Sequence, residues 1–320
     1  MTSASTGPHA APDYGLVHEP LTPLFPRPQT PADWARHALS AEQVRHFRDH
    51  GYVSGIRLLD DAQIEPLRAE LAEMTRPDHA GREHFYEYHA DESAAADTVL
   101  FHALGAWRVR PAFHDLLWNP AFLVPAWQLL GQGFRLFHDQ LFAKPALHGG
   151  VVAWHQDYAY WTWTKPMAHL TCWIGLDDVD ESNGCLHYIP GSHRWGIVER
   201  TALAGDMEAV RARLSPGQRA DFDRRVPIPL ARGAATFHHP LLMHGSYANR
   251  SARPRRATVI NVLADGVRSN MDAANMPGAD HYPKVPKGEP MGGPWYPLLF
   301  DPAAALGDLR TAIPTIDTRC

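Results

Sequence analysis

The sequence predicts a mainly β protein with flanking helices, in which short antiparallel strands form a sandwich or barrel. Apolar and aromatic runs recur from Phe134 to about residue 263, separated by clusters of Gly, Pro and Asn that are typical of turns. Helical periodicity is instead concentrated between about residues 40 and 132. The chain has 320 residues, of which 45% are hydrophobic, so it can bury the core of one large domain.

The first expected elements are an arm and a helix. Residues 1–33 are rich in proline and lack apolar periodicity, so we expect a Pro-rich N-terminal arm before a single domain over residues 34–320. Ser40 is a candidate N-cap, and Val44 and Phe47 recur after it at helical spacing.

Further helices and then strands follow along the chain. A short strand over 51–55 precedes a helix over 61–74, and a helical region over 108–130 is expected to be interrupted at Pro120 and Pro125. The strands of the sandwich are expected at residues 134–143, 151–158, 169–176, 184–189, 233–238, 243–247 and 257–263. We also expect a charged, partly helical insertion at about residues 199–225 and an irregular C-terminal segment from about residue 268.

Composition narrows the class of partner. The formal net charge of −5 gives no basic excess, which argues against nucleic acid or an anionic membrane and favours a small-molecule partner. No apolar run approaches the roughly 20 residues of a membrane span, and the N-terminus has no export-signal pattern. The cysteines Cys172, Cys185 and Cys320 lack CxxC spacing, so we expect a cytoplasmic protein.

Two His-x-Asp pairs are candidate metal ligands. On an extended strand, residues two apart point to the same face, so such a pair offers an imidazole and a carboxylate together. His89 and Asp91 lie in a charged, alanine-rich stretch without strand character. His155 and Asp157 follow the apolar run 151–154, and they are therefore the better candidates.

A third ligand is expected from a later histidine. His244 lies in an apolar strand beside Gly245, whereas His238 and His239 lead into a turn at Pro240, so we favour His244. Two histidines and one carboxylate leave open positions on a metal, as in non-haem Fe(II) oxygenases. From spacing alone, ordinary buried or surface histidines remain the alternative.

Several motifs in order resemble one family. They are Trp154-His155-Gln156-Asp157, Asn183-Gly184-Cys185-Leu186, Pro190-Gly191-Ser192-His193-Arg194, and His244-Gly245-Ser246 with Arg255. Together with residues 47–53, they resemble the phytanoyl-CoA dioxygenase family of Fe(II)/2-oxoglutarate oxygenases over about residues 40–265. The resemblance implies a double-stranded β-helix, a cupin-like jelly roll, with His155, Asp157 and His244 as iron ligands. It also implies 2-oxoglutarate and O2 as co-substrates.

The same resemblance assigns residues around 2-oxoglutarate. Arg255 matches the arginine that binds the distal carboxylate of 2-oxoglutarate, and a guanidinium fork suits a carboxylate. Neighbouring strand residues face opposite ways, so Arg255 and Arg256 cannot both point inward, and we expect the other arginines of this run in solvent. Ser246 lies on the face of His244 and is expected to donate its hydroxyl to the same carboxylate.

Other lining residues follow from alternation and resemblance. Four residues share one face of the strand that leads to Pro145: His138, Gln140, Phe142 and Lys144. The resemblance places His138 or Gln140, and also Trp173, near 2-oxoglutarate. An aromatic cluster just after the metal pair is expected to contact the substrate, together with the adjacent Gln156; its members are Tyr158, Tyr160, Trp161 and Trp163. Packing in an ordinary core is the alternative for all of these residues.

The resemblance implies hydroxylation of an unactivated C–H bond in a small-molecule metabolite, with release of succinate and CO2. Because Asp157 is intact, halogenation is disfavoured; desaturation, cyclisation or epoxidation would depend on how the substrate is placed. A coenzyme A thioester would need a basic entrance, which the acidic balance does not indicate. The alternatives are a cupin-like metal-dependent hydrolase or isomerase, which would not need Arg255, and a non-catalytic binding module.

Overall fold

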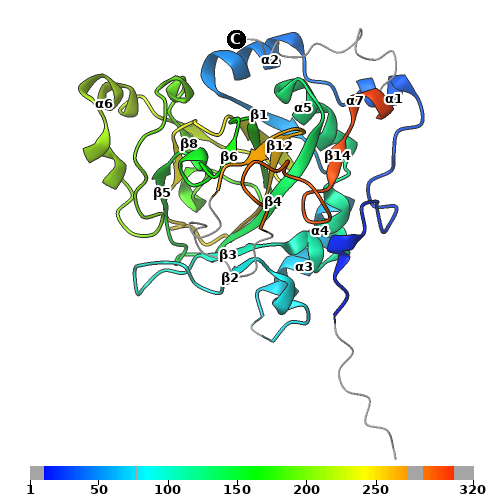
Figure 1. The fold of residues 1–320 in the computed structure, drawn as a ribbon. Helices are drawn as coiled ribbons and strands as arrows, with labels where there is room; N and C mark the ends of the chain where they lie inside the picture. Colours follow the sequence, from blue (N-terminus) through cyan, green and yellow to red (C-terminus); the bar gives the residue numbers. More distant parts are fainter. Residues whose placement is uncertain (1–10, 77, 272–283, 306–320) are drawn as a thin grey trace, which may run out of the picture.

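Two antiparallel sheets face each other in the computed structural model, which describes residues 11–76, 78–271 and 284–305 (Figure 1). The major sheet has the order β1-β10-β7-β12-β4-β3-β2, with β14 also paired to β4, and the minor sheet has the order β5-β11-β8-β9. This arrangement is the double-stranded β-helix that the resemblance implied. A two-stranded sheet, β6 with β13, lies apart from both.

The strands of the major sheet are β1 (Tyr52–Arg57), β2 (Glu87–His89), β3 (Phe101–Leu104), β4 (Phe134–Lys144), β7 (His169–Gly175), β10 (Ala234–His238), β12 (Arg255–Ala264) and β14 (Leu298–Phe300). Those of the minor sheet are β5 (Val152–His155), β8 (Leu186–Tyr188), β9 (Val226–Ile228) and β11 (His244–Ser246). The small sheet joins β6 (Thr164–Lys165) and β13 (Arg268–Ser269). All seven sequence-predicted strands are present, although most are shorter than predicted.

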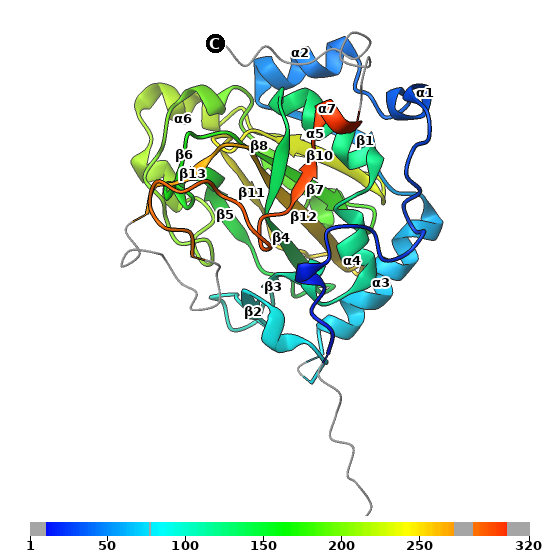
Figure 2. The same ribbon diagram turned by 45° about the vertical axis from the view of Figure 1, so that its right-hand side comes forward.

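The helices mainly cover the outer face of the major sheet. They are α1 (Pro31–Ala35), α2 (Ala41–His50), α3 (Asp61–Met74), α4 (Pro111–Leu116) and α5 (Pro120–Leu130), with α6 (Pro216–Phe222) and α7 (Pro302–Ala305) later in the chain. In Figure 2, α3, α4 and α5 lie on one side of the major sheet, whereas β5 and α6 lie on the other. No described helix is long and apolar enough to cross a bilayer.

Local signals explain the helix boundaries. Ser40 and Gln43 form a capping box at the start of α2, and Gly51 ends that helix with φ +84°, as the sequence suggested. Pro120 occupies the first turn of α5 and starts the helix, whereas Pro125 lies inside it without ending it. The predicted interruption at Pro125 is therefore wrong, because α5 is buried along nearly its whole length and packing holds it helical.

Alternation along β7 separates the core into two layers. Leu170, Cys172 and Ile174 pack with the helices, whereas Trp173 packs between the two sheets. Since both faces of β7 are buried, its run of apolar residues is nearly continuous.

Two parts of the chain differ from the sequence prediction. The short strand expected over residues 51–55 is β1, which forms one edge of the major sheet, whereas β2 and β3, which form the other edge, were not predicted. The stretch after Glu87 was expected to lack strand character, yet β2 includes His89 and pairs with β3. Asp91 accepts hydrogen bonds from the amides of Ser93 and Leu100, so it closes the loop between these strands.

The described part of the N-terminal arm packs against the domain. The carboxylate of Asp13 pairs with Arg108, and the buried carboxylate of Asp115 accepts hydrogen bonds from the amides of Leu21 and Thr22. Residues 199–225 contain α6, and the ring centre of Phe222 in this helix lies 5.0 Å from that of Trp154. From Arg268 onward the described chain forms β13, β14 and α7; residues 272–283 and 306–320 of the predicted irregular segment lie outside the described residues.

Candidate metal centre and co-substrate pocket

Three side chains meet where β5 and β11 pair. His155 is the last residue of β5, and it lies opposite His244, the first residue of β11. Asp157 begins a short 3₁₀ turn instead of continuing the strand. The expectation that strand alternation aligns the His-x-Asp pair is therefore wrong in detail, because the turn, not the strand, brings the carboxylate round to the imidazole.

The donor atoms of these three residues surround a common point. Nε2 of His155 is 3.4 Å from Oδ1 of Asp157, Nε2 of His244 is 3.6 Å from the same oxygen, and all three donors lie within 4.8 Å of one another. Donors about 2.1 Å from one metal and at right angles are about 3 Å apart. The spacing therefore suits three ligands on one face of an ion.

Backbone contacts fix the tautomer of both histidines. Nδ1–H of His155 donates to the carbonyl of Ala153 at 2.8 Å, and Nδ1–H of His244 donates to the carbonyl of Leu242 at 2.9 Å. Each Nε2 therefore carries the lone pair that a metal needs. Burial also lowers the pKa of His244 well below its usual value, which keeps the imidazole neutral.

The second oxygen of Asp157 is held by two donors. Oδ2 accepts hydrogen bonds from Oγ1 of Thr171 at 2.7 Å and from Nε2 of His238 at 3.1 Å. Burial alone would raise the pKa of Asp157, but hydrogen bonding that includes the His238 donor holds it well below its usual value. His238, whose Nδ1 accepts from the Tyr188 hydroxyl, thus orients Asp157 and is not one of the grouped donors.

Arg255 projects into the same cavity from β12. Its side chain is buried, with Nε donating to the carbonyl of Gly184 at 3.2 Å and Nη2 donating to Oγ of Ser246 at 2.7 Å. Nη1 has no hydrogen-bond partner among the described residues. Arg256 faces the other way and pairs with Asp177 at 2.7 Å, so it is not a solvated arginine as expected.

Ser246 supports the guanidinium of Arg255 through its hydroxyl group. Its hydroxyl donates to the carbonyl of Gly184 at 2.9 Å and accepts from Arg255 and from Nζ of Lys144, the latter at 2.6 Å. Lys144 is fully buried, and burial together with Arg255 lowers its pKa well below the usual value. The hydroxyl hydrogen of Ser246 is thus already engaged, so a direct bond to a co-substrate would require it to rotate.

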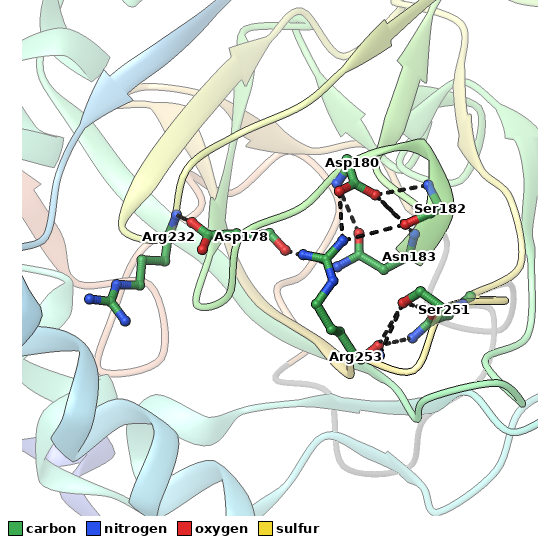
Figure 3. Close-up of polar contacts among 8 residues, drawn as sticks. Asp178, Asp180, Ser182, Asn183, Arg232, Ser251 and Arg253 are labelled. Carbon is green, nitrogen blue, oxygen red and sulfur yellow. Dashed lines mark hydrogen bonds and ion pairs between the residues drawn. The ribbon is translucent and has the colours of Figure 1, made fainter.

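The loop before β8 places the carbonyl that Arg255 uses. Figure 3 shows Arg253 beside Asp180 and Asn183, and the Arg253 guanidinium contacts the Asp180 carboxylate at 2.6 Å. Asn183 donates to the carbonyl of Asp178 at 2.8 Å. These contacts hold the loop that carries Asn183 and Gly184, so the Asn-Gly motif positions the Gly184 carbonyl for Arg255.

Gly184 itself has φ +84°, and a Cβ there would lie 2.5 Å from the carbonyl oxygen of Tyr247. A side chain at this position would therefore move the carbonyl away from Arg255.

One cavity of about 240 Å³ joins these groups. The predicted residues that line it are His155, Asp157, His244, Arg255, Ser246, His138, Gln140, Trp173, Trp161 and Trp163. Gln156 and Tyr158 do not line it. The amide of Gln156 bonds the backbone at Gly196, Val198 and Leu241, and the Tyr158 hydroxyl donates to the Thr164 carbonyl.

Sequence reasoning missed four polar residues of the site. Thr171 precedes Trp173 by two residues, so alternation along β7 could have placed it in the cavity. Asn261 is six residues after Arg255 on the same strand, and both polar atoms of its amide lack a hydrogen-bond partner among the described residues. Lys144 was placed on the inward face without a role, and His238 was weighed only as a metal ligand.

The site fits a divalent metal and a dicarboxylate. Two neutral imidazoles and one carboxylate suit an Fe(II) ion with open positions. Burial lowers the pKa of Arg255 to about 10, so the guanidinium stays charged at neutral pH. A buried cation whose Nη1 is unpartnered within the described chain suits a carboxylate arriving through the cavity.

Comparison with known proteins decides the family. The family model for phytanoyl-CoA dioxygenase (PhyH) matches residues 47–257. The chain belongs to the phytanoyl-CoA dioxygenase family. Membership makes it a dioxygenase, and the metal-binding triad and the Arg255 pocket fit the iron and 2-oxoglutarate on which such enzymes depend.

Relatives and solved structures agree with this assignment. Phytanoyl-CoA dioxygenase of Arabidopsis thaliana is 35% identical over 269 residues, covering 72% of this chain and 91% of the relative. L-proline trans-4-hydroxylase of Streptomyces griseoviridis is 30% identical over 243 residues, covering 68% and 84%. The crystal structure of SnoK, a non-heme alpha ketoglutarate dependent carbocyclase from nogalamycin biosynthesis, superimposes with a TM-score of 0.66 at 25% identity, covering 86% of this chain and all of SnoK.

Proposed function

We propose that the protein uses Fe(II), 2-oxoglutarate and O2 to hydroxylate an unactivated C–H bond of a small-molecule metabolite, releasing succinate and CO2. The observation that carries this proposal is that one cavity joins the metal-binding triad to the buried Arg255, whose Nη1 has no hydrogen-bond partner in the described part of the chain. A metal-dependent hydrolase or isomerase with the same ligands would have no use for that guanidinium.

Each residue has a defined task in this scheme. His155, Asp157 and His244 would hold the iron, and Thr171 would keep the Asp157 carboxylate oriented. Arg255 would bind the distal carboxylate of 2-oxoglutarate, with Ser246 and Gly184 fixing the guanidinium. When bound, iron and 2-oxoglutarate supply the oxidising chemistry, while the protein positions the substrate carbon.

Aromatic side chains and His138 form part of the cavity wall. Trp161 and Phe137 pack edge to face at 5.3 Å beside the cavity, and Trp173 lies beneath the guanidinium of Arg255 at 5.4 Å. Burial lowers the pKa of His138 to about 3, so this imidazole is neutral at neutral pH and would act as a hydrogen-bonding group without net charge.

The named relatives support a small-molecule substrate. They include an ectoine dioxygenase from Bordetella bronchiseptica and the L-proline hydroxylase, both of which act on compact metabolites. The carbocyclase among the solved structures supports a second outcome, ring closure, for the same site.

Substrate-stimulated release of succinate tests the proposal. Candidate metabolites are screened with Fe(II) and 2-oxoglutarate, and the wild type is compared with Asp157→Ala and with the exposed control Asp49→Ala. We expect a stimulated signal that Asp157→Ala abolishes and Asp49→Ala retains. Undiminished release in Asp157→Ala would contradict the proposal.

A further inference from the structure

The cavity extends from the metal site across the inner face of the major sheet to β2. Cross-strand pairing sets five lining residues in one row: Glu87, Leu104, Gln140, Val259 and Trp173. Neighbouring strands are about 4.8 Å apart, so Glu87 lies about 14 Å from Val259 measured along the sheet. The cavity therefore reaches well beyond the space that a metal and a dicarboxylate would fill.

The far end of the cavity carries two carboxylates. The side chains of Glu87 and Glu92 are 34% and 29% exposed, so both are partly shielded from water. Oε2 of Glu92 lies 2.8 Å from Nδ1 of His102. Burial alone would raise the pKa of Glu92, but His102 brings it below its usual value, so the carboxylate is ionised at neutral pH.

His102 gives an independent indication of a ligand at this end. The residue is only 7% exposed, and its ring stacks on Phe142 at 4.5 Å with an interplanar angle of 9°. Its Nε2 has no hydrogen-bond partner among the described residues. A buried polar atom without a partner is costly, so a ligand that offers one would bind favourably here.

Apolar walls connect the acidic end to the metal site. Their residues are Leu100, Leu104, Phe142, Val152, Leu186 and Leu203. Arg200 and Tyr160 also line the cavity, and the guanidinium carbon of Arg200 lies 5.7 Å from the centre of the Tyr160 ring. The cavity thus has an acidic far end, a mainly apolar middle that also includes Gln140, and the candidate metal centre at its other end.

We propose that Glu87 and Glu92 bind an ammonium group of the substrate, so that the enzyme oxidises an amine with an extended apolar body. This inference rests on the proposed function, because it assigns the substrate class of the same site. With its nitrogen at the acidic end, the amine would present a C–H bond remote from that nitrogen to the metal centre. A coenzyme A thioester is disfavoured, because its phosphates would approach two carboxylates.

Binding of a matched series tests the proposal. The probes are octylamine, 1-octanol and octanoate, which share a chain and differ in head-group charge, and they are titrated into protein saturated with Mn(II) and 2-oxoglutarate so that Arg255 is already occupied. Quenching of the cavity tryptophans, which include Trp161, Trp163 and Trp173, reports binding. We expect octylamine to bind about tenfold more tightly than 1-octanol, and octanoate to bind most weakly, because a charge-assisted hydrogen bond is worth about a tenfold change in affinity or more.

Variants locate the effect. The Glu87→Gln/Glu92→Gln double variant should weaken octylamine binding about tenfold and leave 1-octanol unchanged. Glu87→Lys should remove the preference for octylamine over 1-octanol, because the new ammonium group would pair with Glu92 and compete with the amine. Glu83→Gln, an exposed carboxylate four residues before Glu87 and outside the cavity, should behave as the wild type.

The proposal is overturned if octylamine binds no better than 1-octanol, or if the double variant keeps the wild-type preference. Fluorescence titration needs neither iron nor turnover, so its result is distinguishable from that of the succinate assay. Amine preference without any 2-oxoglutarate-dependent turnover would support the acidic binding end and contradict the proposed reaction. Succinate release with amines and neutral molecules alike would support the proposed reaction and contradict the acidic binding end.

Discussion

Replacing Arg255 with lysine isolates the role of the guanidinium fork. In the structure, Nε of this side chain donates to the Gly184 carbonyl and Nη2 donates to Ser246, while Nη1 has no partner among the described residues and the side chain lines the cavity. A lysine keeps the positive charge but has a single nitrogen, which cannot bond the two protein groups and also bind a carboxylate in the same geometry.

The expected loss follows from the hydrogen bonds involved. Hydrogen bonds to charged groups contribute about 1.5–3 kcal/mol each, and every 1.4 kcal/mol is a tenfold change in affinity. Because lysine retains the charge, we expect the lower part of that range, so that Arg255→Lys weakens 2-oxoglutarate binding about 10- to 100-fold. The rate at saturating 2-oxoglutarate should change much less, because this interaction anchors the end of the co-substrate remote from the reacting atoms.

Calorimetric titration of 2-oxoglutarate into the Mn(II)-loaded protein measures this loss without turnover. Arg256→Lys is the matched control, because Arg256 is the adjacent residue, faces the opposite side of the strand and pairs with Asp177. The reasoning is refuted if Arg255→Lys binds 2-oxoglutarate within twofold of the wild type, or if Arg256→Lys loses as much.

Three further substitutions test other contacts. Thr171→Val removes one of two donors to the Asp157 carboxylate, so Fe(II) affinity by equilibrium dialysis should fall about tenfold or more, whereas unchanged affinity would contradict the orienting role. Gly184→Ala should lower the midpoint of urea unfolding and weaken 2-oxoglutarate binding together, since its Cβ would meet the Tyr247 carbonyl; retention of both would be inconsistent with the observed packing. Burial lowers the pKa of His169 to about 3, so between about pH 6.5 and pH 3 the unfolded chain binds a proton at this residue and the folded chain does not. Folding stability should therefore fall as the pH is lowered from about 6.5 to about 3. At pH 5 this amounts to about 2 kcal/mol for His169, and His169→Asn should flatten the pH dependence of urea unfolding of the metal-free protein by that amount; the exposed control His18→Asn should not, and an equal slope in both variants would count against the argument.

The fold was predictable because its signals are local. Ser40 followed by Val44 and Phe47 is a cap followed by helical spacing, and α2 begins and ends as those residues predict. The edge strands β2 and β3 were not predictable in the same way. β2 has three residues, and its pairing with β3 spans a loop that is closed by Asp91, so tertiary context rather than local periodicity forms it.

The candidate site divides along a similar line. His155, Asp157, His244 and Arg255 were identified from their motifs, and the structure brings all four to one cavity. Gln156 and Tyr158 are adjacent to the ligands in sequence, but their side chains bond backbone groups instead. Thr171 lies two residues before Trp173 on β7, and Asn261 lies six residues after Arg255 on β12, so alternation from a predicted residue could have placed both, although neither belongs to a motif.

The acidic end of the cavity shows why net charge is a poor guide to a binding site. The net charge of −5 for the whole chain gave no indication of a basic entrance, and it could not show that Glu87 on β2 and Glu92 in the following loop both line the cavity. That placement depends on contacts between different segments of the chain, and composition carries no information about such contacts.

The most direct test of the account is the visible absorption of the anaerobic protein with Fe(II) and 2-oxoglutarate. A weak charge-transfer band should appear when both are added to the wild type, and it should be absent from Asp157→Ala and His244→Ala. A band of equal intensity in either variant, or none in the wild type at saturating Fe(II) and 2-oxoglutarate, would contradict the assignment of iron and co-substrate to this cavity.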